Sequence, residues 1–138
     1  MDSSLLRKHS EGLIATQACI GGLINQAGLW DYVNGINGVT EGQVIDNMIN
    51  ISEEMNSIFH GNFFLELQWN AIPEQHLSNQ ISIKVSEKTG IPLISTADCH
   101  YPNPKLWKER EVYKKLAQLS KTKDFTLDDT PDSINDMK

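Results

Sequence analysis

An aspartate and a histidine two positions apart are the residues of this chain best suited to chemistry. Asp98 and His100 follow an apolar run over 91–94 and three small residues over 95–97. In an extended strand, residues i and i+2 point to the same side, so both side chains would project from the carboxyl end of a buried strand. Active sites of α/β barrels are built at that end, and a carboxylate beside an imidazole suits zinc or manganese. The alternative is a polar strand end where the two bond only to each other or to the backbone.

Composition limits the class of protein. The chain has 138 residues, 39% of them hydrophobic and 22% charged, which is ordinary for one globular domain. Its net charge of −6 argues against broad nonspecific binding to nucleic acid or anionic membranes. No apolar run approaches the roughly 20 residues of a membrane span, and the first residues do not form a secretory signal. Cys19 and Cys99 make no C-x-x-C pair, so we expect a reduced, cytoplasmic protein.

Three short apolar segments have the pattern of parallel strands. They cover residues 12–19, 63–69 and 91–97, and each is bounded by Gly, Asn or Pro. A helical pattern follows each of them, and the order β-α-β-α-β-α predicts parallel strands joined by crossovers. Three such units cannot close the usual eight-stranded barrel. The predicted fold class is therefore α/β, as a small open sheet or as part of a larger barrel.

Helix start and stop signals flank the first two predicted helices. Thr40 and Gln43 form a capping-box pattern before an amphipathic helix over 41–59. Pro73 can open the next helix at its first position, and Gly90 is placed to end it.

A third helical pattern begins at Asn103-Pro104. Its inner face is expected at Leu106, Tyr113, Leu116 and Ala117. From Lys121 the pattern fades into a polar, turn-rich segment. We therefore predict a domain over 1–120 and a polar tail or linker over 121–138.

Several blocks of sequence resemble, in order, one protein family. The blocks are Lys8-His9-Ser10-Glu11-Gly12-Leu13-Ile14-Ala15, Ala18-Cys19 with Gly21-Gly22, Phe64-Leu65-Glu66-Leu67-Gln68, Ile72-Pro73-Glu74-Gln75, Thr89-Gly90-Ile91-Pro92-Leu93 and Ser95-Thr96-Ala97-Asp98-Cys99-His100-Tyr101. Together they resemble the carboxyl-terminal part of the PHP (polymerase and histidinol phosphatase) domain of bacterial and phage DNA polymerase III alpha subunits. The resemblance runs from about residue 5 to residue 104.

The resemblance implies part of a distorted barrel of parallel strands, with up to three metals at the carboxyl ends. Family members with an intact site hydrolyse phosphoesters, including by 3′-to-5′ exonuclease activity, whereas in others the site has decayed and the domain serves structure. By motif match, Cys19 falls where the family places a Cys or His ligand, and Asp98 and His100 fall on its last Asp-x-His. This set implies zinc or manganese, or magnesium, and attack of a metal-bound hydroxide on a phosphodiester.

The chain also departs from the family pattern. It contains neither the family's amino-terminal H-x-H nor the carboxylates of the polymerase palm. We therefore expect a fragment of the polymerase that is inactive alone, in which no catalytic residue is assignable and the metal site is completed from outside. Its expected partners are the amino-terminal half of the PHP domain, the polymerase core, DNA through the whole enzyme, and the proofreading subunit.

Two residues of the second strand are expected to support this site. Glu66 and Gln68 lie on the inward face of the 63–69 segment, and a buried Glu must be paired, protonated or linked to a metal. We expect both to orient other groups by hydrogen bonds rather than to bind metal. The alternative is a buried network without chemistry. For Cys19 the ligand interpretation is preferred because of its place in the family block, and the alternative is a small buried hydrophobe. Cys99 is expected in the core.

Three functional hypotheses remain open. The leading one is a part of a DNA polymerase III alpha subunit that contributes later ligands of a metal-dependent phosphoesterase site. The second is a noncatalytic interaction module, and the third is a small stand-alone metallophosphoesterase. The third has least support, because three ligands on an open half-barrel hold a metal poorly.

Overall fold

The computed structural model describes residues 3–100 and 102–118. They divide into two compact units, which we describe separately. Unit 1 comprises the residues up to Gln68 together with Ile72–Thr96, and unit 2 comprises Trp69–Ala71 and the described residues from Ala97 onward. The domain boundary predicted between 120 and 121 lies outside the described residues.

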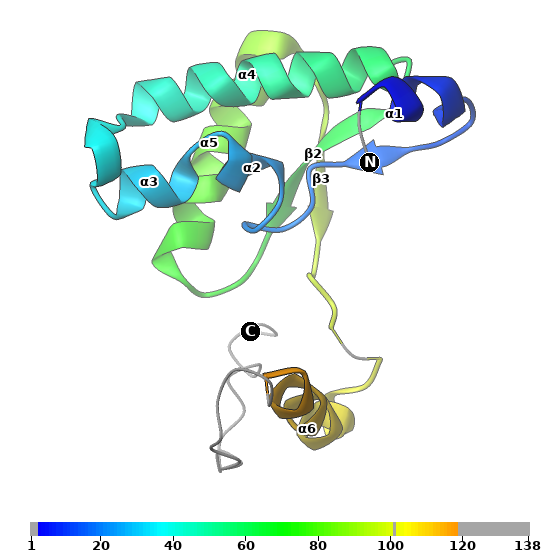
Figure 1. Cartoon of the computed structure of the whole chain (residues 1–138), viewed down its shortest axis with the longest axis vertical. Coiled ribbons are helices and arrows are strands. Elements are labelled where there is room, and N and C mark those ends of the chain that lie inside the picture. Colours follow the sequence, from blue (N-terminus) through cyan, green and yellow to red (C-terminus); the bar gives the residue numbers. More distant parts are fainter. Residues whose placement is uncertain (1–2, 101, 119–138) are drawn as a thin grey trace. The chain divides into compact units, whose positions relative to one another are not determined.

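Unit 1 is built on a sheet of three parallel strands. In chain order these are β1 (Ala15–Thr16), β2 (Phe63–Gln68) and β3 (Leu93–Thr96), and β2 lies between the other two (Figure 1). The α/β class and the parallel strands are thus confirmed. However, β1 is far shorter than the predicted 12–19, and β3 ends at Thr96 instead of residue 97.

One helix of unit 1 precedes β1, and the others fill the segments between the strands. They are α1 (Ser3–His9), α2 (Leu23–Gln26), α3 (Leu29–Val33), the 3-10 turn η1 (Ile36–Gly38), α4 (Glu41–Ile58) and α5 (Pro73–Thr89). The two long helices α4 and α5 contact each other and both contact β2 (Figure 1). None of the described helices is both long enough and apolar enough to cross a membrane.

The ends of α4 and α5 form as their sequence signals predict. Thr40 Oγ1 accepts a hydrogen bond from Gln43 N at 3.3 Å, and Gln43 Oε1 accepts one from Thr40 N at 2.9 Å, so the capping box satisfies two donors at the start of α4. Gly90 ends α5 with φ 74°, a left-handed conformation that glycine adopts without steric cost, and its N–H donates to Ser86 O at 2.8 Å.

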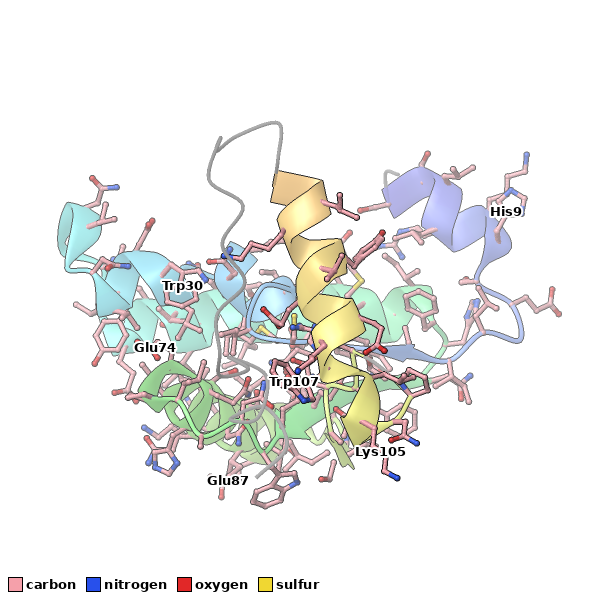
Figure 2. All side chains as sticks on the ribbon, turned by 90° about the horizontal axis from the view of Figure 1, so that it is seen from below. His9, Trp30, Glu74, Glu87, Lys105 and Trp107 are labelled. Atoms are coloured by element: carbon pink, nitrogen blue, oxygen red, sulfur yellow. The ribbon has the colours of Figure 1, made fainter. Side chains whose placement is uncertain are left out.

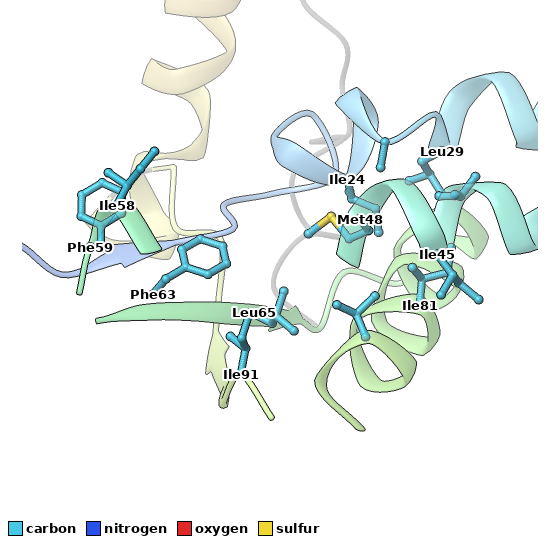
Figure 3. Packing of buried hydrophobic residues seen from close by; sticks show 13 residues of the cluster. Ile24, Leu29, Ile45, Met48, Ile58, Phe59, Phe63, Leu65, Ile81 and Ile91 are labelled. Carbon is cyan, nitrogen blue, oxygen red and sulfur yellow. The ribbon is translucent and has the colours of Figure 1, made fainter. Parts of the chain in front are cut away.

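The hydrophobic core lies on one face of the sheet. Phe63 and Leu65 of β2 point to this face and are at most 1% exposed. They join one cluster with helix residues that include Met48 of α4 and Ile81 of α5 (Figure 3). Burying a side chain of this size contributes about 1.5–3 kcal/mol, so this face stabilises the unit.

The opposite face of β2 is polar toward its carboxyl end. Because side chains alternate along a strand, Phe64, Glu66 and Gln68 share this second face. Glu66 is only 7% exposed and Gln68 only 3%, which confirms the prediction that both are buried. Their polar groups therefore need partners inside the protein.

Unit 2 contains the 3-10 turn η2 (Pro104–Leu106) and helix α6 (Trp107–Gln118). Asn103 starts them as predicted, since its Oδ1 accepts from Lys105 N at 2.9 Å. The prediction of an inner face at Leu106, Tyr113 and Leu116 is wrong, because these residues are 39%, 74% and 54% exposed. The side chain of Ala117 is not among those that the structure describes. The buried position is Glu111, whose carboxylate lies 3.3 Å from the guanidinium of its neighbour Arg110; this pairing reduces the cost of burying the charge.

Candidate functional site

The carboxylate of Glu66 connects all three strands of the sheet near their carboxyl ends. Its Oε2 accepts a hydrogen bond from Ala18 N, just after β1, at 3.0 Å. Its Oε1 accepts from Gln68 Nε2 at 3.1 Å and from the hydroxyl of Thr96 on β3. The hydroxyl of Thr16 on β1 donates to the same carboxylate. One side chain of β2 thus holds the ends of both neighbouring strands.

These hydrogen bonds control the charge of Glu66. Burial alone raises the pKa of this carboxyl, because it removes water from the charged form. The donors on Thr16, Thr96, Gln68 and Ala18 outweigh burial, so the pKa lies below its ordinary value of 4.5. Glu66 is therefore ionised at neutral pH and satisfied by uncharged donors.

Cys19 lies in a tight turn directly after β1. Ala18 takes the left-handed φ of 66°, and the chain then reverses through a hydrogen bond from Gly22 N to Cys19 O at 2.8 Å. A Cβ on Gly22 would lie 2.7 Å from Gln17 O, so only glycine fits there. The Cys19 thiol is free and half-buried. The backbone conformation of this turn is therefore specific, and it determines the position of Cys19.

Where β1 ends, two side-chain amides take its place along the edge of β2. Gln17 Oε1 accepts from Glu66 N at 3.5 Å and from Ser82 Oγ of α5 at 3.1 Å. Asn79 of α5 pairs with both backbone groups of Gln68: its Oδ1 accepts from Gln68 N at 3.2 Å and its Nδ2 donates to Gln68 O at 2.7 Å. The backbone of β2 is thus satisfied although β1 has ended.

Sequence reasoning missed Gln17 and Asn79. The helix α5 buries polar positions as well as apolar ones, and these include Gln75, Ser78 and Ser82. These three positions recur at helical spacing and signal a polar side of α5, but neither Gln17 nor Asn79 belongs to it. The roles of Gln17 and Asn79 depend on contacts between distant segments, which local patterns do not show.

Unit 2 brings Asp98 and His100 together. Asp98 Oδ1 lies 4.0 Å from His100 Nε2. The second carboxylate oxygen, Oδ2, accepts a hydrogen bond from Asn70 Nδ2 at 3.2 Å. Asn70, which the sequence did not single out, is therefore a third member of this cluster.

The expected reason for this pairing is wrong in one respect. The strand ends at Thr96, and Asp98 has φ 48°, so strand alternation does not place Asp98 and His100 on one side. For the same reason, Cys99 does not point to the core and is exposed. The loop after β3, rather than the strand itself, sets the direction of these side chains.

The donor chemistry of the Asp98–His100 pair fits a divalent metal. A carboxylate oxygen and an imidazole nitrogen are ligands that zinc and manganese accept, and they would form part of a coordination shell. The third predicted ligand, Cys19, belongs to unit 1. Among the described residues, no group of three or more His, Cys, Asp and Glu side chains is arranged to hold a metal. His9 is exposed at the end of α1 (Figure 2).

Comparison with known proteins gives relatives of one kind. No protein-family model matches the chain. The DNA polymerase III subunit alpha of Aquifex aeolicus (strain VF5) is 36% identical over 104 residues, which cover 75% of this chain and 8% of the relative. That of Thermus aquaticus is 34% identical over 129 residues, 94% of this chain and 9% of the relative. The subunit of Helicobacter pylori (strain J99) is 34% identical over 112 residues, which cover 81% of this chain and 9% of the relative.

The match covers most of this chain but a small part of each relative. The chain spans less than a tenth of the length of these curated relatives. It is therefore homologous, over most of its length, to a short stretch of proteins named DNA polymerase III subunit alpha.

Proposed function

We propose that the chain is part of a DNA polymerase III alpha subunit, acts in DNA replication, and contributes later ligands to a PHP-type metal-dependent phosphoesterase site. The similarity to alpha subunits supports the replication role. The parallel sheet, with polar groups gathered at its carboxyl end, supports a site of this kind. The observation that carries the metal role is the Asp98–His100 pair, with 4.0 Å between Oδ1 and Nε2.

Each residue has a separate task in this proposal. Asp98 and His100 bind a divalent cation, which is zinc, manganese or magnesium, and Cys19 adds a thiolate that favours zinc. A metal bound there supplies an activated water for attack on a phosphodiester. Glu66 holds Ala18 N and so fixes the turn that carries Cys19, while Gln68 holds Glu66 Oε1. Glu66 and Gln68 are thus positioning residues rather than ligands.

The rest of the polymerase chain is the proposed partner and the source of the remaining ligands. β1 and β3 are the edge strands of the described sheet, and edge strands can pair with further strands. Next to β1, Leu13 is 52% exposed and Ile14 73%. Apolar side chains beside a strand edge favour a contact with more of the same protein, namely the amino-terminal half of the PHP domain and the polymerase core. DNA would be contacted through the whole enzyme.

The test is metal affinity of the chain assembled with the remaining parts of the alpha subunit. Cys19→Ser, Asp98→Asn and His100→Ala each remove a proposed ligand, so each is expected to weaken zinc and manganese binding by at least the roughly 10- to 100-fold that loss of an outer-shell partner costs. His76→Ala is the matched control, because His76 is exposed on α5 and should leave binding unchanged. Unchanged affinity in the first three variants would show that the metal role is wrong.

A double variant tests whether residues of the two units bind the same ion. If Cys19 and His100 bind the same metal ion, their contributions to metal binding are coupled. The loss of metal-binding free energy in Cys19→Ser/His100→Ala will then differ from the sum of the losses in the two single variants. Additive losses would show separate sites.

A noncatalytic interaction module is the second candidate. The exposed apolar residues of α6, Tyr113 and Leu116, favour it, since exposed apolar faces mark contact sites. It predicts that Tyr113→Ser and Leu116→Ser weaken assembly with the rest of the alpha subunit while the metal-ligand variants leave assembly and metal content unchanged.

A further inference from the structure

We propose that Asn70 is a positioning residue for Asp98 and His100. The inference rests on the function proposed above, in which these two residues bind a divalent metal. Asn70 Nδ2 donates to Asp98 Oδ2 at 3.2 Å, and the other carboxylate oxygen, Oδ1, lies 4.0 Å from His100 Nε2. Asn70 therefore binds one oxygen of the Asp98 carboxylate, and the other oxygen lies toward the imidazole of His100.

The strand register explains why Asn70 meets Asp98. Leu65 pairs with Leu93, and Gln68 with Thr96, so β2 and β3 pair at a constant spacing of 28 residues. Asn70 and Asp98 are also 28 residues apart, each two positions beyond a paired residue. The contact therefore joins the two loops that follow these paired strands.

Asp98 needs such support because of its backbone. Its φ of 48° is a left-handed conformation that side chains other than glycine rarely adopt, although Asp tolerates it better than most. Residues in such conformations persist where their surroundings hold them, and they cluster at functional sites. The hydrogen bond from Asn70 fixes the carboxylate of Asp98 in this loop.

The chemistry of an amide suits this task. Asn70 is uncharged, so it orients the carboxylate without placing a positive charge where a metal would bind. Its Oδ1 is buried without a hydrogen-bond partner among the described residues. An unpaired buried acceptor is unfavourable, and such groups in native structures call for a functional explanation. We infer that the side-chain amide of Asn70 keeps the orientation in which Nδ2 donates to Asp98, although this orientation leaves Oδ1 without a partner among the described residues.

The first test needs no metal and uses the full 138-residue chain. In a nitrogen-15 NMR spectrum, the side-chain amide protons of Asn70 should exchange slowly with water and shift when Asp98 is changed to Ala. The exposed Asn50 on α4 is the internal control, and its side-chain signal should stay in place. If the side-chain amide signal of Asn70 likewise does not shift in Asp98→Ala, the inference is overturned.

The second test uses Mn²⁺ as a paramagnetic probe, because line broadening detects weak binding. The ring signals of His100 should broaden selectively, with His9, His60 and His76 as internal controls. In Asn70→Ala, the Mn²⁺ concentration for half-maximal broadening should rise about tenfold or more, while thermal unfolding stays unchanged. Asn50→Ala should leave both quantities as they are.

The outcomes separate this inference from the proposed function. Selective broadening with an unchanged midpoint in Asn70→Ala overturns the role of Asn70 and leaves the metal role standing. Broadening that does not favour His100, measured on the wild-type chain assembled with the remaining parts of the alpha subunit, overturns the metal role and this inference with it. A raised midpoint together with a shifted Asn70 amide signal supports both.

Discussion

Oε2 of Glu66 accepts a hydrogen bond at 3.0 Å from the backbone N–H of Ala18, 48 residues away in the sequence. Ala18 has φ 66°, and this left-handed conformation costs a non-glycine residue about 1–2 kcal/mol. A hydrogen bond to an ionised carboxylate contributes about 1.5–3 kcal/mol, enough to offset that cost. A carboxylate on β2 therefore determines where the chain goes after β1 and how Cys19 is presented.

Glu66→Gln should destabilise unit 1 by about 2 kcal/mol. The substitution keeps the volume but places an NH₂ group among the donors of Thr16, Ala18 and Thr96, so that at least one donor loses its acceptor. Urea unfolding followed by circular dichroism measures the loss. Glu53→Gln is the control, because Glu53 is exposed on α4 and should change stability by less than about 0.5 kcal/mol. Equal stability of the two variants would contradict the role of Glu66.

The same residue should make stability depend on acid pH. The pKa of Glu66 is lowered in the folded protein, so the unfolded chain binds more protons as the pH falls below the ordinary value of 4.5. The stabilisation by Glu66 is complete above pH 4.5 and is lost as the pH falls through the folded-state pKa. Unfolding free energies measured across this range should therefore fall more steeply for the wild-type chain than for Glu66→Gln. Parallel curves would refute the lowered pKa.

Two glycine substitutions should have opposite effects. A Cβ at Gly22 would meet Gln17 O at 2.7 Å and Cys19 O at 3.1 Å, both backbone atoms, so Gly22→Ala should cost about 2 kcal/mol or more and raise the alkylation rate of Cys19. At Gly42 in α4 the nearest atom would be Thr40 Oγ1 at 3.9 Å, so Gly42→Ala should stabilise the protein by about 0.5–1 kcal/mol. Thermal unfolding and iodoacetamide labelling measure both effects. Similar unfolding temperatures of Gly22→Ala and Gly42→Ala would mean that the turn at Cys19 can shift to accommodate the added Cβ.

Asn79→Ala should cost about 2 kcal/mol, because it leaves Gln68 N–H and C=O without partners at the edge of β2. Hydrogen exchange should quicken at Gln68 and remain slow at Leu65, whose N–H donates to Pro92 O on the other side of the strand. Asn50→Ala serves as the exposed control. Unaltered exchange at Gln68 would show that another group satisfies its backbone.

The elements with strong local signals could be predicted from the sequence. The capping box at Thr40, the glycine stop at Gly90 and the alternation along β2 each depend on neighbouring residues, and the structure has each of them. The short length of β1 could not be predicted, because its end depends on Glu66, which holds Ala18 from another strand. Local patterns carry no information about such distant partners.

The site was predictable only in its residue types. The sequence identified Asp98, His100 and Glu66, and the structure pairs the first two and buries the third. It did not identify Asn70, because its meeting with Asp98 depends on the register of two strands. The metal role of Cys19, Asp98 and His100 remains a prediction.

The carboxamide of Asn79 has a further consequence for how the protein can associate. An unsatisfied strand edge invites a foreign strand to pair with it, which is a common route to aggregation. At Gln68 both backbone groups on the β1 side are already occupied by Asn79, so a new strand would first have to displace a side chain held by α5. Growth of the sheet is thereby blocked at the carboxyl end of β2 and directed to the outer edges of β1 and β3. Asn79 thus hinders the pairing of a foreign strand with β2 at the position where β1 has ended.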